Sequence, residues 1–187
     1  GDVYKRQRQA IEWDTCLAAR WQRDGRTGYL LPLDVSLEMR LTDLIGVDKQ
    51  LDQLGRNTKQ FLDGLPANHA LLWGSRGTGK SSLIRALLAE YAGAGLRLIE
   101  IERDHLADLP RVVEQLQGLA QRFVLFCDDL SFESGESDYR VLKSVLDGSL
   151  EQAPDNVLLY ANSNRRHLVP EKESDNENWK NVDGELH

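Results

Sequence analysis

The sequence predicts an α/β fold of three layers, in which helices cover both faces of a parallel sheet. From residue 69 onward, short apolar runs alternate with longer segments whose apolar residues recur at helical spacing. Strands that alternate with helices are joined by right-handed crossovers, so they lie parallel. Ligands of such sheets bind at the carboxyl ends of the strands, so the residues after each strand are the candidates for a site.

Each predicted strand is a continuous apolar run, which is typical of strands buried on both faces. The four strands span residues 69–73, 96–101, 123–127 and 157–161. The predicted helices span residues 47–62, 81–92, 109–119 and 139–150. Gly93 and Pro154 are among the residues that separate these segments. The predicted order from residue 69 is therefore β-α-β-α-β-α-β.

The region before the first of these elements is predicted to be helical. Trp13, Leu17 and Trp21 recur every four residues, which is the spacing of one helix face. We expect this stripe to pack on the domain, with docking of a partner as the alternative. The predicted organisation is an N-terminal helical extension at residues 8–40 and a core domain at residues 41–187.

Composition excludes several classes of protein. The chain has 187 residues, a net charge of −7 and two cysteines, Cys16 and Cys127. The negative charge argues against a generally basic nucleic-acid binder, and two cysteines make neither a disulfide framework nor a metal site. No apolar run approaches the roughly 20 residues that span a bilayer. We therefore expect a cytoplasmic protein without a membrane segment.

Both ends of the chain are predicted to be incomplete. Residues 1–7 resemble a translated sequencing adapter, so we do not expect them to belong to the fold. Residues 171–187 hold six acidic and two basic residues with little apolar content, which indicates a solvated loop. We expect a fragment that was cut inside this loop.

The first predicted strand leads into a phosphate-binding pattern. Residues 74–81 match G-x-x-x-x-G-K-[ST], the Walker A pattern. Its glycines let backbone N–H groups surround phosphate oxygens, and the following helix points its positive end at them. Lys80 is expected to reach the β- and γ-phosphates, and the Ser81 hydroxyl to ligate Mg²⁺. The residues expected to bind the phosphates are Gly74, Ser75, Arg76, Gly77, Thr78, Gly79, Lys80, Ser81 and Ser82.

Two acids follow the third predicted strand, where a Walker B pattern would place them. Asp128 is expected to hold Mg²⁺ through water, because Mg²⁺ keeps several of its waters. Asp129 stands where a base orients the attacking water. Glu133 is a weaker candidate for the same role.

Polar residues also follow the fourth predicted strand. Asn164 or Asn162 is expected to lie between the γ-phosphate and the Walker B acids and to position the water. An Asn/Ser turn without a role is the alternative. Arg165 and Arg166 are expected to face solvent or a neighbouring subunit.

Together these segments resemble the AAA+ ATPases, a superfamily of P-loop NTPases. An upstream Leu44-Ile45-Gly46-Val47 resembles the segment that lines the adenine pocket in that superfamily, which implies Ile45 and Gly46 as nucleotide contacts. More narrowly, the chain resembles an uncharacterised bacterial AAA+ family that carries only a domain-of-unknown-function label. The resemblance implies ATP and Mg²⁺ as ligands, homo-oligomers with arginine fingers supplied in trans, and a protein or nucleic-acid partner. Lys80, Asp129 and Asn164 are the implied catalytic residues, and Ser81 and Asp128 the implied metal ligands.

Two departures from the AAA+ pattern affect the expected activity. Walker B usually reads Asp-Glu, and Asp129 reaches about one methylene less far than a glutamate. The resemblance also implies a fifth strand, an arginine finger and a helical lid, which the sequence does not reveal before His187. We therefore expect residues 69–73 to form an apolar sheet edge. We expect turnover below about 1 s⁻¹, because an arginine finger contributes about 10³ to 10⁵ in kcat.

Three functions compete on this evidence. The first is an ATPase that couples hydrolysis to the remodelling or loading of a macromolecular partner. The second is an ATP-gated binding module or switch with little hydrolysis, which the Asp129 departure favours. The third is a small-molecule kinase, which the sensor-like asparagine and Ile45-Gly46 argue against.

Overall fold

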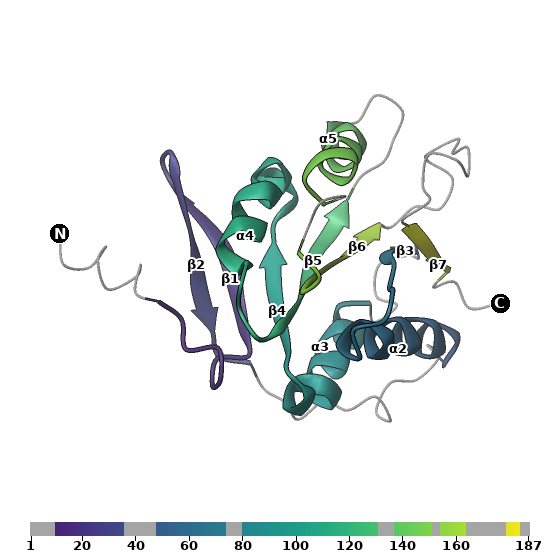
Figure 1. Ribbon diagram of the computed structural model, residues 1–187. Coiled ribbons are helices and arrows are strands. Elements are labelled where there is room, and N and C mark those ends of the chain that lie inside the picture. Colours follow the sequence, from purple (N-terminus) through teal and green to yellow (C-terminus); the bar gives the residue numbers. More distant parts are fainter. Residues whose placement is uncertain are drawn as a thin grey trace.

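In a computed structural model, the described part of the chain folds around one sheet of seven strands (Figure 1). The structure describes residues 10–35, 48–73, 80–130, 137–150, 154–163 and 179–183. The strands are β1 (Ala18–Asp24), β2 (Thr27–Leu33), β3 (His69–Trp73), β4 (Leu96–Ile101), β5 (Arg122–Leu130), β6 (Val157–Ser163) and β7 (Trp179–Asp183). Their order across the sheet is β2-β1-β4-β5-β6-β3-β7. All neighbouring strands pair in parallel except β1 and β2, which are antiparallel.

Helices cover both faces of this sheet, as the sequence predicts. The α-helices among the described residues are α2 (Asp48–Leu62), α3 (Lys80–Tyr91), α4 (Leu109–Leu116) and α5 (Ser137–Val145), and α5 continues into a π-helical turn at Leu146–Leu150. Short 3₁₀ segments lie at Ala92–Ala94 and Arg103–Asp108. In the described part of the chain, no helix is long and apolar enough to cross a membrane.

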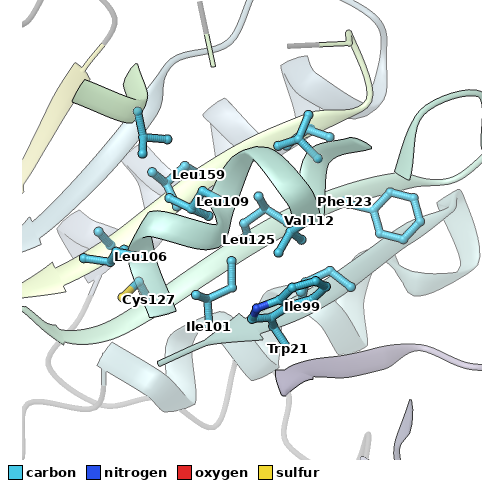
Figure 2. Packing of buried hydrophobic residues seen from close by; sticks show 14 of the residues in the cluster. Trp21, Ile99, Ile101, Leu106, Leu109, Val112, Phe123, Leu125, Cys127 and Leu159 are labelled. Carbon is cyan, nitrogen blue, oxygen red and sulfur yellow. The ribbon is translucent and has the colours of Figure 1, made fainter. Parts of the chain in front are cut away.

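The two faces of the sheet carry two separate apolar cores, because successive residues of a strand point to opposite sides. Leu125 and Leu159 pack with α4 residues such as Val112 on one face (Figure 2). Val124 and Leu158, their neighbours in sequence, pack on the other face with α2 and α3. This alternation explains why the predicted strands are apolar throughout. It confirms the three-layer arrangement.

The predicted N-terminal helix is wrong: its second half is strand β1, which forms a hairpin with β2. Gly25 makes the turn with φ +61°, a conformation that favours glycine. Trp21 is fully buried, and its indole Nε1 donates to Asp108 Oδ2 at 3.0 Å. A Cβ at Gly28, on β2, would come within 2.0 Å of the Trp21 ring. The ring therefore packs directly over the backbone of β2, and β1 extends the parallel sheet beside β4.

A second correction concerns the strand that precedes the Walker A pattern. Residues 69–73 were expected at an apolar edge, but β3 lies between β6 and β7. Residues 179–183, expected in a solvated loop, form β7 and pair in parallel with the whole of β3 from His69↔Trp179 to Trp73↔Asp183. Within the described residues β3 is therefore an interior strand, and the expected apolar sheet edge is wrong.

A buried polar network fixes α2 against β6. Thr58 donates to the Leu54 carbonyl at 2.7 Å, so the Tyr160 hydroxyl, 2.7 Å from Thr58 Oγ1, is the donor of that pair. Asn57 Nδ2 donates both to the Tyr160 hydroxyl and to the Asn68 carbonyl, at 3.1 and 2.7 Å. Burial raises the pKa of Tyr160 to about 12, so the phenol keeps its proton at neutral pH. These hydrogen bonds fix the position of α2 along the direction of strand β6.

Candidate functional site

The carboxyl ends of β3, β5 and β6 meet at one edge of the sheet, where the sequence places the candidate site. β3 ends at Trp73 and α3 begins at Lys80. The intervening Walker A residues 74–79 lie outside the described residues, as do Ile45 and Gly46. The structure therefore fixes the strand before the pattern and the helix after it. This strand and helix are the context that a P-loop requires.

The start of α3 stands at this edge with its backbone N–H groups unpaired within the helix. Lys80 and Ser81 are its first two residues, and Ser82 follows, partly buried. The partial positive charge of a helix start favours an anion there. Lys80, Ser81 and Ser82 begin the helix that follows the Walker A pattern, and their part in phosphate binding stays a prediction.

The Walker B acids terminate β5 at an irregular point. Phe123 to Cys127 are buried, whereas Asp128 and Asp129 are exposed. Cys127 pairs with Ala161 and Leu130 with Ser163, so β5 carries one residue more than β6 over this stretch. Such a bulge bends the strand and re-aims a side chain.

Asp129, within this bulge, has a left-handed backbone conformation. Its φ is +59°, and within the described residues no other non-glycine residue has a positive φ. Its N–H donates to Asp128 Oδ1 at 2.8 Å. Arg103 lies two residues after the end of β4. Its Nη1 donates to the Asp129 carbonyl oxygen at 3.5 Å. Left-handed backbone at an acidic residue costs energy and is concentrated at functional positions.

Asn162, on β6, is in hydrogen-bond contact with Asp128. Its Nδ2 donates to Asp128 Oδ1, and the residue is 4% exposed. Its other amide atom, Oδ1, is buried without a hydrogen-bond partner. Because β6 lies between β5 and β3, this contact directs the Asp128 carboxylate toward the strand that precedes Walker A. Asn164, the other predicted asparagine, lies outside the described residues, as do Glu133, Arg165 and Arg166.

On the side of β5 that faces β4, away from Asn162, the Walker B acids border a cavity of about 550 Å³. Arg85 of α3 and Arg20 of β1 both pair with Glu100 of β4 in its wall, at 3.1 and 2.8 Å. Three arginines and five acidic residues line the cavity, so acidic side chains outnumber basic ones there. The cavity is therefore not a purely basic site of the kind that binds anions. The sequence did not single out Glu100, within β4, or Arg103, which begins the 3₁₀ segment after it, as residues of this cavity.

The donor set fits a magnesium ion held partly by a nucleotide. Among the described residues, no group of three or more His, Cys, Asp or Glu is arranged to hold a metal ion. Mg²⁺ is usually bound by one or two protein oxygens together with phosphates and water. The described part of the chain supplies one such oxygen donor at this edge, the Asp128 carboxylate at the end of β5, and Ser81 follows Lys80 at the start of α3. Ser81 and Asp128 are the residues that would hold the ion.

Comparison with known proteins places the chain in a family. Residues 14–187 match the family model described as "Protein of unknown function (DUF815)". The chain belongs to the DUF815 family. No protein of curated function matches the sequence of this chain.

Two solved structures share the fold of this DUF815 chain. One is the HORMA:CdnC:Trip13 complex of E. coli MS115-1, with a TM-score of 0.59 at 14% identity over 80% of this chain and 64% of that one. The other is the Aeropyrum pernix ORC1 protein in complex with DNA, with a TM-score of 0.55 at 18% identity over 74% of this chain and 44% of that one. The chain thus spans less than two thirds of both relatives. These neighbours are AAA+ P-loop proteins, so the predicted α/β fold of AAA+ type is confirmed.

Proposed function

We propose that this chain binds ATP·Mg²⁺ at the carboxyl edge of β3, β5 and β6 and hydrolyses it. The observation that carries the proposal is the contact between Asp128 and Asn162. It joins the ends of two strands at the edge where α3 begins with Lys80. An acid, an amide and a helix start at one sheet edge form a site for a metal-bound phosphate.

Each residue has a defined task in this proposal. Lys80 and the backbone of residues 74–79 hold the phosphates, and Ser81 and Asp128 hold the magnesium ion. Asn162 donates to Asp128, which leaves its buried Oδ1 to accept a hydrogen bond from the attacking water. Asp129 orients or deprotonates that water. When bound, ATP would supply the electrophilic γ-phosphorus, and Mg²⁺ would supply positive charge that stabilises the transition state of hydrolysis.

The hydrolysis would be coupled to remodelling or loading of a macromolecular partner in the cytoplasm, with the chain acting as a homo-oligomer. Support comes from the fold, because one neighbour is part of a multiprotein complex and the other is bound to DNA. An oligomer would supply the arginine finger in trans.

The backbone of Asp129 favours a second candidate, an ATP-gated switch with little hydrolysis. Asp129 is shorter than the glutamate usual in Walker B. Its left-handed φ and its place in a bulge restrict the direction of its side chain. If that orientation keeps the carboxylate away from the water, ATP would order an assembly without being consumed. Asp129→Asn separates the two candidates, because it removes the base and retains the shape.

The test combines nucleotide binding with turnover. The chain is expected to bind a fluorescent ATP analogue in the presence of Mg²⁺ and to lose at least tenfold in affinity when EDTA is added. Asp128→Asn should abolish the Mg²⁺ dependence, whereas Asp52→Asn, an exposed acid of α2, should not alter it. Mg²⁺-independent binding by the unmodified chain would contradict the proposed site. Loss of slow phosphate release in Asp129→Asn supports the ATPase, and release unchanged by that substitution favours the switch.

A further inference from the structure

The cavity of about 550 Å³ on the β4 side of the Walker B acids has an apolar floor. Ile84 of α3, Leu98 of β4 and Phe126 of β5 line it and belong to one hydrophobic core. Ligand pockets commonly measure about 300–1,000 Å³, so this one has room for a side chain and the backbone on either side of it. A ligand with an apolar stem can therefore be buried there.

The arginines of the cavity are engaged by its own wall. Arg20 Nη2 and Arg85 Nη2 donate to the two carboxylate oxygens of Glu100, at 2.8 and 3.1 Å. Arg103 Nη1 donates to the Asp129 carbonyl oxygen. Five acidic residues line the cavity together with these three arginines, so the wall keeps an excess of two negative charges. The ligand that complements this charge is a cation.

Two of the acids, Glu102 and Asp104, stand at the rim of the cavity. They flank Arg103 directly after β4, and both are exposed. Within the described part of the chain, neither carboxylate has a hydrogen bond or an ion pair. Both can therefore receive a cation without breaking an existing contact. The net charge of −7 on the whole chain draws a cationic partner toward it.

We propose that this cavity binds a basic segment of a partner polypeptide through one inserted lysine or arginine side chain. The alkyl stem packs on Leu98 and Phe126, and the charged head reaches Glu102 and Asp104. The cavity is larger than one such side chain, so neighbouring residues of the segment enter as well. This room favours a polypeptide over a free amine.

The peptide site is distinct from the proposed nucleotide site, although the Walker B acids border both. Strand β5 lies between β4 and β6, and Asn162 meets Asp128 from the β6 side. The cavity lies on the other side, toward β4 and away from β3. A basic side chain in it therefore does not take the place of an arginine finger at the γ-phosphate. The inference goes beyond the proposed function and needs no nucleotide.

The test measures peptide binding to the nucleotide-free chain by fluorescence anisotropy at low salt. Labelled alanine hexapeptides are compared in which every second residue is arginine, citrulline or glutamate. Citrulline has nearly the shape of arginine without its charge. The chain is used unmodified, as the double variant Glu102→Gln/Asp104→Asn, and as the control Glu114→Gln/Asp63→Asn. The control removes the same charges from two exposed sites outside the cavity.

The arginine peptide is expected to bind the unmodified chain and the control equally, within about twofold. The cavity variant should bind it about five- to thirtyfold more weakly, because two charge-assisted contacts are lost. The citrulline and glutamate peptides should bind the unmodified chain about tenfold or more weakly than the arginine peptide does. Since Glu102 and Asp104 are exposed, the cavity variant should unfold in urea at the midpoint of the unmodified chain.

Four results would overturn the inference. Equal weakening in the two double variants would show that net charge, and not the cavity, holds the peptide. A citrulline peptide that binds as well as the arginine peptide would show that charge is not recognised. Tighter binding of the glutamate peptide would assign the cavity an acidic partner, and a folded chain that binds none of the peptides would leave it without one. None of these results bears on ATP binding, so the proposed function is tested separately.

Discussion

Acidification should weaken the strand that leads into the Walker A pattern, through His69. This residue begins β3, and its Nδ1 accepts a hydrogen bond from the Leu159 N–H at 3.0 Å. The imidazole is therefore neutral, with its proton on Nε2. Burial lowers the pKa of His69 from 6.5 to about 4. Because the folded pKa is depressed, the stabilisation is complete above pH 6.5 and is lost as pH falls toward 4.

The magnitude follows from the two pKa values. At pH 5.0 the unfolded chain is about 1.5 units below its His69 pKa of 6.5, whereas the folded chain remains unprotonated there. At 1.36 kcal/mol per unit this amounts to about 2 kcal/mol of unfolding free energy. The ring is not fully shielded from solvent, so we expect about 1–2 kcal/mol between pH 7.5 and pH 5.0.

The assay is urea unfolding at both pH values, with His69→Asn as the matched variant. The asparagine Oδ1 can accept the Leu159 N–H in place of Nδ1, but it does not titrate. All carboxylates and the other histidines remain, so the difference between the two proteins isolates His69. A pH dependence of equal size in both proteins would refute the assignment.

Three further substitutions test the packing and the backbone. Gly28→Ala should destabilise the fold by about 2–3 kcal/mol in urea unfolding, since the new Cβ meets the buried Trp21 ring. Gly55→Ala, the control, has open space in α2 and should stabilise by about 0.5–1 kcal/mol; equal effects would contradict the hairpin packing. Asp129→Gly should raise stability by about 1 kcal/mol, because it relieves a positive φ, and should abolish phosphate release in a single-turnover assay; lower stability would contradict the strain. Tyr160→Phe should lose about 1–2 kcal/mol of unfolding free energy, as it deletes two buried hydrogen bonds; an unchanged midpoint would show that the network contributes nothing.

The central strands and helices were predictable because their signals are local. Strands β3 and β4 begin and end where their apolar runs do, and α3 occupies the predicted helix after Walker A. A run buried on both faces needs no knowledge of its neighbours to be recognised. The fold class therefore followed from alternation along the chain.

The N-terminal hairpin and β7 were not predictable in the same way. A spacing of four residues, as between Leu17 and Trp21, satisfies the helical period and is also a multiple of the strand period of two. The turn at Gly25 and Arg26 separates two strands rather than ending a helix. Residues 179–183 include only two apolar residues, Trp179 and Val182, in an acidic, polar stretch, and they pair as a strand with β3. Tertiary pairing decided both segments.

The candidate site was predictable in part. The Walker A pattern is contiguous in sequence, so it can be recognised without a structure. The choice of Asn162 as the partner of Asp128 depends on the register of β5 and β6 and on the bulge before Leu130. The charged cavity beside β5 is visible only when α3, β4 and the segment after β4 are placed together.

ATP·Mg²⁺ calorimetry on three forms of the chain tests the central claim most directly. The forms are the unmodified chain, Lys80→Ala and Lys59→Ala, which removes the same charge from an exposed site at the far end of α2. The account predicts equal binding by the unmodified chain and Lys59→Ala, and at least a tenfold loss in Lys80→Ala. Binding that is equal in all three forms, or no binding by a chain that still unfolds cooperatively, would contradict it.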